Sequence, residues 1–586
     1  MNKIFTLLLM AFCIAGFVYA SDDVGPYDWK ISYEFEIANP ARKVIQVKAE
    51  YIFPSMTDEV VFQMDDEDNH YTEGYRKHLR AFQLKDSQGN KVDFITDTTG
   101  LYRATGLRGT YTASYVVVLD HINKEQSKLG PDDTPIMWGH IAVFPGASVV
   151  IYPWDVGGSR IGSIEISFKL PDVATFVTPY EKIGENRYSV PSVALLKSEF
   201  WAAGAFDSCV YEKGGDSIIC SMSKEGLGFQ IDDIRPKVDS VFDYFTNLFG
   251  ALPVHKISMS IIATPSSQRS SGHHSFGSVG KCSFNCLIDE KVTPRELGSQ
   301  MGLIAYNVLS FWTPSHFQPA SRIKLDWFTT AALNYMQLKS MLHLGFIDEA
   351  EFLAKVARTY NTYRKDLKRK GLSLSVLMSL PNSPDRSVYG LMVCVMFDLL
   401  LHSGTDGEQS LESVLRTLNE TYGGATGYTE EDLYKVFSDV GLTDIDDLID
   451  KHVTAAGLVS LEELLKPYGM IVRREKSGTP EIGLRLRGEK DLTIEWVDSE
   501  GAAKKAGLEF GDVLSEVRGF KMSETSDLPK LISKLRPGSE VDVVYVRNGE
   551  KKSTTVVLGN RMLYRIGPET TASEAEKNLW AKFMQP

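Results

Sequence analysis

The sequence predicts a multidomain α+β protein, because the spacing of apolar residues changes twice along the 586-residue chain. From Trp29 to about Leu170, apolar and polar residues alternate, which is the pattern of strands with one buried face. From about Phe176 to Tyr468, apolar residues recur at helical spacing instead. After the polar stretch 473–480, short strands and glycine-rich turns return. We therefore expect an N-terminal β-sandwich, a mainly helical domain with a small sheet, and a small C-terminal domain.

The expected elements and boundaries follow this spacing. Inward-facing strand residues of the sandwich are expected at Ile31, Tyr33, Phe35, Ile37, Ile164, Ile166, Phe168 and Leu170. In the second domain, a helix with its apolar face at Val238, Val241, Phe242, Phe245 and Phe249 is expected to end at Gly250, before a strand over Ile257–Ile262. We expect the sandwich over residues 21–175, the helical domain over 176–470, the C-terminal domain over 475–560, a linker at 473–480 and a tail over 561–586.

The N-terminus predicts export. Lys3 precedes an apolar run from Ile4 to Val18, and small residues end the segment at Ala20, so residues 1–20 have the pattern of a secretory signal peptide. We expect a secreted or periplasmic protein. No later apolar stretch is expected to cross a bilayer, which argues against an integral membrane protein.

The charge of the chain restricts its partners. A net charge of -13 argues against nucleic acid as a partner, because binding to phosphates needs concentrated positive charge. There is one basic cluster, which we interpret as a solvated helix end: Arg364, Lys365, Lys368, Arg369 and Lys370.

Cysteine spacing predicts one disulfide. The chain has six cysteines, of which one lies in the signal segment. Cys209 and Cys220 flank a turn at Gly214–Asp216 between two apolar strands, and in an oxidising compartment we expect them to be bonded across this hairpin. Cys282 and Cys286 are close enough to pair, but they fit two small buried side chains equally well.

A helix with a capped start is expected between Thr293 and Pro319. Thr293 and Glu296 fit a capping box, and Pro294 fits the first turn. The apolar residues at helical spacing are Leu297, Met301, Ala305, Val308 and Trp312. On this helix Tyr306 and Ser310, four residues apart, are expected to share one face.

The C-terminal region resembles a PDZ domain. The run from Gly501 to Gly519, GAAKKAGLEFGDVLSEVRG, is similar to that family's small-residue helix followed by a turn and a strand. The positions that resemble the family's peptide-binding loop and strand are Ile482, Gly483, Leu484 and Leu486. The resemblance implies a groove that adds a ligand as an extra strand and binds its terminal carboxylate with loop N–H groups. A domain that only docks against its own chain would have the same sequence pattern.

The order of sandwich, helical domain and PDZ domain resembles the glycyl aminopeptidase family of gluzincin zinc peptidases. Framework positions of that family match at Trp312, Pro319, Trp327, Phe328 and Tyr335. The resemblance implies a thermolysin-like helical domain. In an active gluzincin, an HExxH helix presents two imidazoles to zinc, and the adjacent Glu acts as general base.

The residues that would carry this chemistry are replaced. The family's HExxH motif corresponds to Tyr306, Asn307, Val308, Leu309 and Ser310. Its third zinc ligand corresponds to Thr330, and its catalytic tyrosine corresponds to Ser387. Its GGxEH motif is matched only weakly, by residues 271–275. Phenols and alcohols ligate zinc weakly, and an amide cannot take a proton from water. We therefore expect no zinc cofactor and no catalytic residues at these positions.

These observations predict an exported, catalytically inactive relative of the glycyl aminopeptidases. It would act as a scaffold that binds the C-termini of peptides or proteins through its PDZ domain. The part of the chain that corresponds to the family's substrate cleft could also bind peptides. The alternative is a residual or rerouted metallo-aminopeptidase with an unrecognised site. Metal binding by His273, His274 and His316 is a rival hypothesis, although their spacing fits no common zinc pattern. A serine hydrolase has less support, because the chain has no GxSxG elbow.

Overall fold

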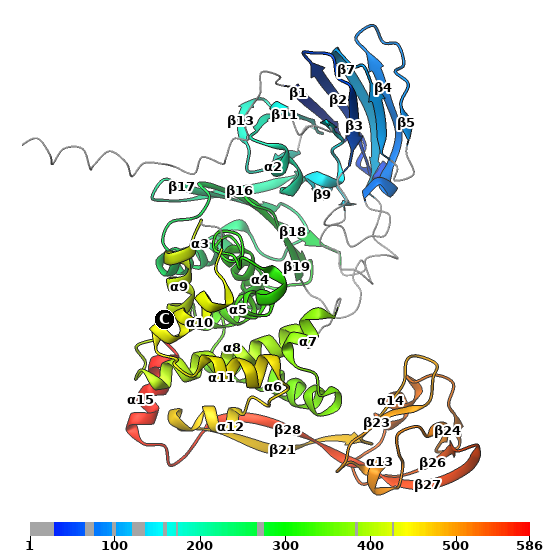
Figure 1. Ribbon diagram of the computed structural model, residues 1–586, viewed down its shortest axis with the longest axis vertical. Coiled ribbons are helices and arrows are strands. Elements are labelled where there is room, and N and C mark those ends of the chain that lie inside the picture. The colour runs from blue at the N-terminus through cyan, green and yellow to red at the C-terminus, as the bar shows by residue number, and fades with distance from the viewer. Residues whose placement is uncertain are drawn as a thin grey trace, which may run out of the picture. The chain divides into compact units, whose positions relative to one another are not determined.

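The computed structural model describes residues 29–64, 75–96, 101–119, 135–155, 161–171, 174–265, 275–380, 385–424 and 427–585. The signal peptide predicted at residues 1–20 lies outside these described residues. The chain forms two compact units (Figure 1). Unit 1 consists of Met1–Asp239 and Ala251–Asn307, and unit 2 consists of Ser240–Gly250 and Val308–Pro586.

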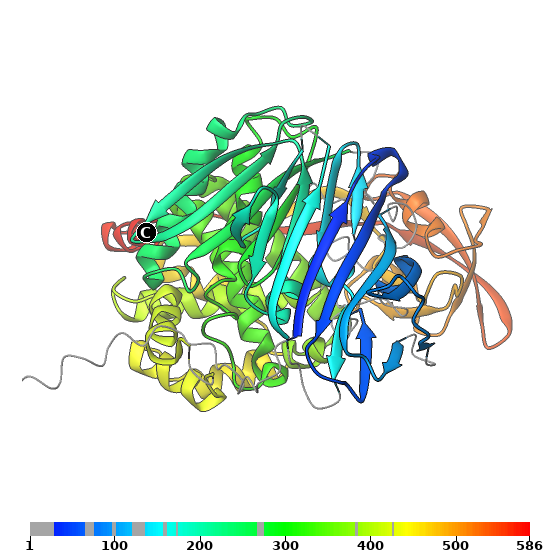
Figure 2. The ribbon, with the colours of Figure 1, turned by 90° about the horizontal axis from the view of Figure 1, so that it is seen from above.

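Unit 1 contains the predicted β-sandwich. Its larger sheet has the order β13-β14-β11-β1-β2-β7-β4, and Figure 2 shows its blue and cyan strands side by side. The strands are β1 (Trp29–Glu36), β2 (Val44–Phe53), β4 (Leu79–Asp86), β7 (Gly109–Val118), β11 (Ile161–Lys169), β13 (Glu181–Gly184) and β14 (Arg187–Val190). A smaller sheet, β10-β3-β6-β5, contains β3 (Glu59–Gln63), β5 (Ile95–Thr96), β6 (Tyr102–Thr105) and β10 (Tyr152–Asp155). Both sheets contribute to one hydrophobic core, in which Ile31, Tyr33 and Phe35 are 2%, 1% and 0% exposed.

The rest of unit 1 is also mainly β. One sheet, β12-β15-β9-β8, contains β8 (Ile136–Trp138), β9 (Ile141–Pro145), β12 (Thr175–Val177) and β15 (Phe200–Gly204). The other, β16-β17-β18-β20-β19, contains β16 (Phe206–Lys213), β17 (Asp216–Ser223), β18 (Lys256–Thr264), β19 (Ser275–Val279) and β20 (Ser283–Asp289). Strands therefore continue well beyond Phe176, where helical spacing is expected to take over. The reason is that β17, β18 and β20 run parallel and β18 and β20 are almost continuously buried, so they lack alternation.

Two helices accompany these sheets, α2 (Val193–Ser198) and α3 (Ile231–Phe249). The predicted helix before Gly250 is α3, and Val238, Val241 and Phe242 on it are 2% exposed or less. The chain can turn at Gly250 because glycine tolerates its φ of 88°.

The first part of unit 2 is helical, as predicted. Its helices are α5 (Arg322–His343), α6 (Glu349–Lys370), α7 (Leu374–Ser379), α8 (Asp385–Gly404), α9 (Leu411–Tyr422), α10 (Glu430–Val440), α11 (Ile445–Ile449) and α12 (Leu461–Leu464). They follow α4 (Leu297–Leu309), which carries the degenerate zinc motif.

Helix α8 is the one helix of the described residues that is long and apolar enough to cross a membrane, over Arg386–Gly404. The expectation that no later stretch has this length and composition is therefore wrong. However, 67% of that window is buried inside the protein, where α8 packs against α5 and α6. A central helix surrounded by other helices is apolar on all sides for the same physical reason as a membrane helix.

The PDZ region has a core of its own in unit 2. One sheet, β25-β24-β26-β27, contains β24 (Val513–Val517), β25 (Phe520–Lys521), β26 (Glu540–Arg547) and β27 (Glu550–Val557). A second pairs β22 (Leu484–Leu486) with β23 (Ile494–Val497), and the helices are α13 (Ala502–Lys505) and α14 (Asp527–Ile532).

A two-stranded ribbon connects the PDZ region to the helices. Residues 473–480, expected as a linker, lie within β21 (Met470–Glu481), which pairs antiparallel with β28 (Gly559–Pro568). Most of β21 is at least partly exposed, so its sequence lacks the alternation of a half-buried strand. The predicted tail includes most of β28 and then α15 (Glu574–Phe583). Trp580 on α15 is 8% exposed, and its indole N–H donates to Glu349 on α6 at 2.8 Å.

Candidate functional site

The residues that the resemblance matches to the HExxH motif lie at the end of α4. The predicted pairing of Thr293 with Glu296 is present, because the Thr293 amide and hydroxyl both donate to Glu296 Oε2, at 3.0 and 2.9 Å. The regular helix begins only at Leu297. Tyr306 and Asn307 lie on α4 in unit 1. Ser310 follows the last helical residue and belongs to unit 2.

Asn307 stands where the motif has its glutamate, and it is 1% exposed. Its side-chain amide donates to Cys286 Sγ at 3.6 Å. Burial raises the pKa of Cys286 to about 12, so this thiol stays protonated at neutral pH. Asn307 and Cys286 therefore form part of a buried polar contact.

The other two replaced positions lie on helices of unit 2. The carbonyl of Thr330 on α5 accepts a hydrogen bond from the Asn334 side chain at 2.7 Å, as in an ordinary helix turn. Ser387, near the start of α8, is exposed. In the part of the chain that the structure describes, no three His, Cys, Asp or Glu side chains are grouped so as to hold a metal ion. His273 and His274, and most of the predicted GGxEH-like segment, lie outside that part.

The hairpin of β16 and β17 places Cys209 directly opposite Cys220. Its two-residue loop, Gly214–Gly215, has φ values of 62° and 95°, which only glycine adopts without strain. Both cysteines are thiols here. A hydrogen bond from the Cys220 thiol lowers the pKa of Cys209 to about 7. Their disulfide stays a prediction.

The predicted carboxylate loop of the PDZ region is built around Gly483. Gly483 has a φ of 75°, and a Cβ on it would lie 3.1 Å from Gly501 Cα. Only glycine fits this position without strain. The carbonyls of the loop point inward: Ile482 O accepts from Ala503 N at 2.8 Å, and Gly483 O accepts from Asp498 N at 2.9 Å.

The loop amides are available to a ligand. Within the described residues, the amides of Ile482 and Gly483 donate to no protein acceptor. Strand β22 follows the loop directly, and among the strands that the structure describes it pairs with β23 alone. An unpaired strand edge beside free loop amides has the donors that strand addition and carboxylate binding require.

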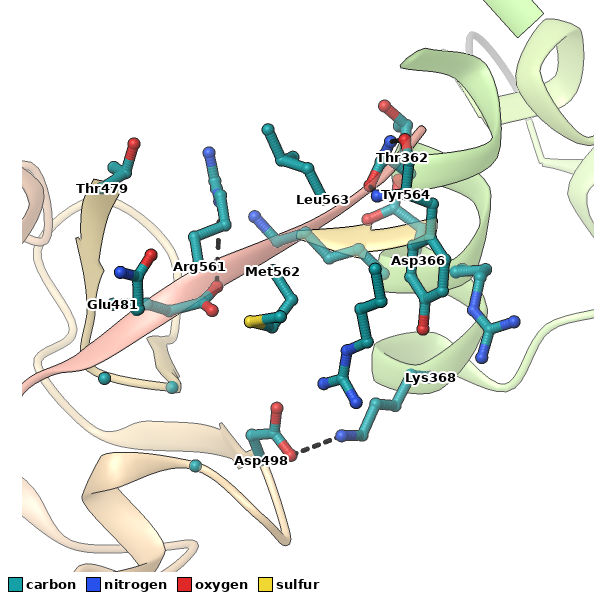
Figure 3. A pocket seen from close by; sticks show the side chains of 18 of the residues that line it. Thr362, Asp366, Lys368, Thr479, Glu481, Asp498, Arg561, Met562, Leu563 and Tyr564 are labelled. Carbon is teal, nitrogen blue, oxygen red and sulfur yellow. Dashed lines mark hydrogen bonds and ion pairs between the residues drawn. The ribbon is translucent and has the colours of Figure 1, made fainter. Parts of the chain in front are cut away.

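The loop and β22 open into a pocket of about 2480 Å³ (Figure 3). From the PDZ region, its wall includes Ile482, Gly483, Leu484, Leu528 and Ile532, with the last two on α14. The rest of the wall comes mainly from α6, β21 and β28, and Figure 3 shows β28 running from the PDZ region to α6. The structure thus brings Ile482, Gly483 and Leu484 together at one pocket, whereas Leu486 is buried in the domain core.

Helix α6 is held to the PDZ region and to β28 by specific contacts. The Asn361 side chain bonds both the N–H and the C=O of Tyr564, at 2.8 Å each. Arg364 lies over the Tyr564 ring at 4.5 Å, and Lys368 Nζ donates to Asp498 Oδ1 at 2.6 Å.

The interpretation of the basic cluster as a merely solvated helix end is therefore wrong for Arg364 and Lys368. Spacing alone could not show their partners, because Tyr564 and Asp498 are distant in sequence. The one sequence feature that pointed to this region was the cluster of basic residues itself.

Comparisons with known proteins agree with this architecture. A family model described as PDZ domain matches residues 480–558. The crystal structure of an aminopeptidase N family protein from Idiomarina loihiensis superimposes with a TM-score of 0.72, covering 95% of this chain and 100% of that one, at 13% identity. The chain has an aminopeptidase N fold with a PDZ domain. At that identity the likeness shows the fold alone, and the predicted gluzincin-type architecture is confirmed.

The PDZ segment of this aminopeptidase N fold also matches proteins of another class. It is 41% identical over 64 residues to a probable periplasmic serine endoprotease DegP-like of Halomonas elongata. A protein of the same name from Ectopseudomonas mendocina is 35% identical over 84 residues. These matches span 11% and 14% of this chain, and only 14% and 17% of the two relatives. The similarity therefore concerns the PDZ segment.

Proposed function

We propose that this protein is an exported receptor for the C-termini of peptides or proteins, built on an aminopeptidase N fold that no longer holds zinc. The single observation that carries the proposal is the carboxylate loop. The amides of Ile482 and Gly483 have no protein acceptor among the described residues, and they line an open pocket next to the free edge of β22.

The walls of the pocket favour a ligand with an apolar last residue. Leu484, Leu528 and Ile532 line the pocket beside the loop. A short added strand buries little surface, so we expect affinities on the order of micromolar. The pocket volume of about 2480 Å³ supports a groove that is not filled by the protein's own side chains.

The proposal that catalysis is lost rests on the residues at the motif. Tyr306, Asn307 and Ser310 replace the two histidines and the glutamate, and the Asn307 amide is committed to Cys286. None of the three can ligate zinc well or act as a general base. The rival proposal is a rerouted metallo-aminopeptidase. Release of amino acids from peptides by the purified protein, abolished by a chelator, would favour that rival.

We also propose a periplasmic location. Two findings support it: the signal-like N-terminus, and the similarity of the PDZ segment to proteins named as probable periplasmic endoproteases. Expression of the full sequence in a Gram-negative host, followed by osmotic-shock fractionation, tests the location. Retention of the whole, uncleaved chain in the cytoplasm would contradict it.

Peptide binding is tested on the full chain by fluorescence polarisation with a library of peptides that end in a free carboxylate. We expect peptides with an apolar last residue to bind, and their amidated forms to bind at least tenfold more weakly. Leu484→Lys, in the groove, should abolish binding. The matched control is Phe510→Lys, because Phe510 is 70% exposed and does not line the pocket. Absence of binding by every peptide, or equal loss in both variants, would overturn the proposal.

A further inference from the structure

The carboxylate loop has a cation next to it that does not come from the PDZ region. Lys368 belongs to α6, and its ammonium donates to Asp498 Oδ1 at 2.6 Å (Figure 3). Asp498 in turn braces the loop: its amide donates to Gly483 O at 2.9 Å, and its Cβ lies 3.4 Å from the place of a Cβ on Gly483. Asp498 thus contacts both Lys368 and the loop, and Lys368, Ile482 and Gly483 line the same pocket.

Lys368 retains donors for a ligand. A lysine ammonium has three N–H groups, and Asp498 is its only hydrogen-bond partner among the described residues. Its side chain is 46% exposed, so the remaining donors can reach solvent or a bound molecule. An ammonium with spare donors beside two amides is suited to a carboxylate.

The charge around the pocket agrees with an anionic ligand group. The whole chain carries a net charge of -13. Among the residues that line the pocket, however, Lys and Arg outnumber Asp and Glu by nine to five. A locally positive wall in an acidic protein attracts a negative ligand group and repels a positive one.

We propose that Lys368 completes the carboxylate receptor, so that the ligand's C-terminus is bound jointly by the PDZ loop and by a helix of the aminopeptidase fold. The inference rests on the proposed function and deepens it. In the bound state, one oxygen of the terminal carboxylate accepts from the Ile482 and Gly483 amides, and the other accepts from Lys368. Lys368 is then a specificity residue for a free C-terminus.

The competing explanation is that Lys368 and Asp498 form only a latch between α6 and the PDZ region. Two substitutions separate the explanations. Lys368→Met removes the cation and breaks the ion pair. Asp498→Asn breaks the same pair but leaves the cation, and its side-chain oxygen can still accept from the Glu500 amide, which bonds Asp498 Oδ1 at 3.0 Å. A latch predicts the same direction of change for both variants, whereas a receptor predicts opposite directions.

The experiment measures the affinity of the full chain for a fluorescent peptide with an apolar last residue, in free and amidated forms, at several salt concentrations. We expect Lys368→Met to weaken binding of the free form about tenfold, to leave the amidated form unchanged, and to flatten the salt dependence. We expect Asp498→Asn to strengthen binding of the free form severalfold. The control is Lys355→Met, which changes the same charge on the same helix at a residue that does not line the pocket.

The outcomes are distinguishable. Weaker binding in both variants, an equal effect of Lys368→Met on both peptide forms, or no effect at all would overturn the role of Lys368 while leaving the proposed function standing. If the wild-type chain binds no peptide, the proposed function fails, and the inference fails with it.

Discussion

Asn307 is the residue that the sequence resemblance matches to the glutamate of the gluzincin motif. In an active zinc peptidase, that glutamate takes a proton from water. Here the side chain is an amide, 1% exposed, and bonded to Cys286 Sγ at 3.6 Å. An amide has no basic lone pair, and this one is directed to a buried thiol. Asn307 therefore packs as a buried polar side chain against Cys286.

Zinc content follows from the same residues. We predict that the purified protein holds less than stoichiometric zinc, because Tyr306, Asn307, Ser310 and Thr330 offer no good ligand. Elemental analysis after dialysis against metal-free buffer measures it. One tightly held zinc per chain that is lost in Tyr306→Phe or Ser310→Ala would contradict the prediction.

Gly483 permits a prediction with a close control. Gly483→Ala should weaken peptide binding and speed amide exchange in the loop, because the added Cβ would meet Gly501 at 3.1 Å in a backbone of φ 75°. The strain should be on the order of 1–3 kcal/mol. Gly519→Ala is the control, since Gly519 has a similar φ of 77° but nothing within 4 Å of its Cβ position. Hydrogen-exchange mass spectrometry on the full chain compares them, and equal effects would refute the role of the close approach.

Cys209 and Cys220 give a prediction that depends on pH. In reduced protein, alkylation of Cys209 should rise through about pH 7, because the Cys220 hydrogen bond stabilises its thiolate, while Cys286, with a pKa of about 12, stays unreactive. In oxidised protein, non-reducing peptide maps should recover the two cysteines in one linked fragment. The disulfide should stabilise the fold by about 2–4 kcal/mol. Free labelling of both in protein isolated from an oxidising compartment would rule the disulfide out.

At the scale of elements, α5, α8 and α9 are joined by a buried ionic network. Lys339 on α5, 2% exposed, donates to Asp398 on α8 at 2.8 Å and to Glu412 on α9 at 2.5 Å. Burial alone would lower the pKa of Lys339, but the two carboxylates outweigh it and raise that pKa. Burial would likewise raise the pKa of Glu412, but Lys339 and His343 hold it at about 2.

The network makes the free energy of unfolding dependent on pH in the acidic range. Because the folded pKa of Glu412 lies below its ordinary value of 4.5, its contribution is complete above that pH and is lost as the pH falls toward about 2. Lys339→Met should destabilise the helical part by about 3–5 kcal/mol, since it removes the buried cation that both carboxylates contact. Urea unfolding followed by tryptophan fluorescence measures both effects. Lys355→Met, on α6, is the control. If Lys339→Met lowers the free energy of unfolding by no more than Lys355→Met does, the network does not stabilise the fold.

Sequence patterns predicted some elements better than others. Alternation located β1 and β11, and helical spacing located α3, because each buries one face only. The parallel strands β18 and β20 and the ribbon of β21 and β28 have no such pattern. The former are almost continuously buried, and the latter are half-buried or exposed along most of their length. At the site, Gly483 was identified from a local motif. Lys368 and Asp498 were not, because they are 130 residues apart and only the fold brings them together.

At the scale of the whole molecule, the chain combines an aminopeptidase N fold with a PDZ domain. It has a TM-score of 0.72 to an aminopeptidase N family protein, and the predicted peptide-binding loop of its PDZ domain lines an open pocket. The fold is stabilised by hydrophobic cores that do not depend on a bound zinc ion. The residues of a zinc motif can therefore be replaced without loss of the architecture.

We propose above all that this aminopeptidase fold recognises C-termini without cleaving peptides. The most direct measurement is a calorimetric titration of the metal-free full chain with a peptide that has an apolar last residue and a free carboxylate, with mass analysis of the peptide afterwards. The account predicts saturable binding on the order of micromolar, strong loss on amidation, and an intact peptide. Binding unaffected by amidation, no binding, or a peptide shortened from its amino end once zinc is supplied would contradict it.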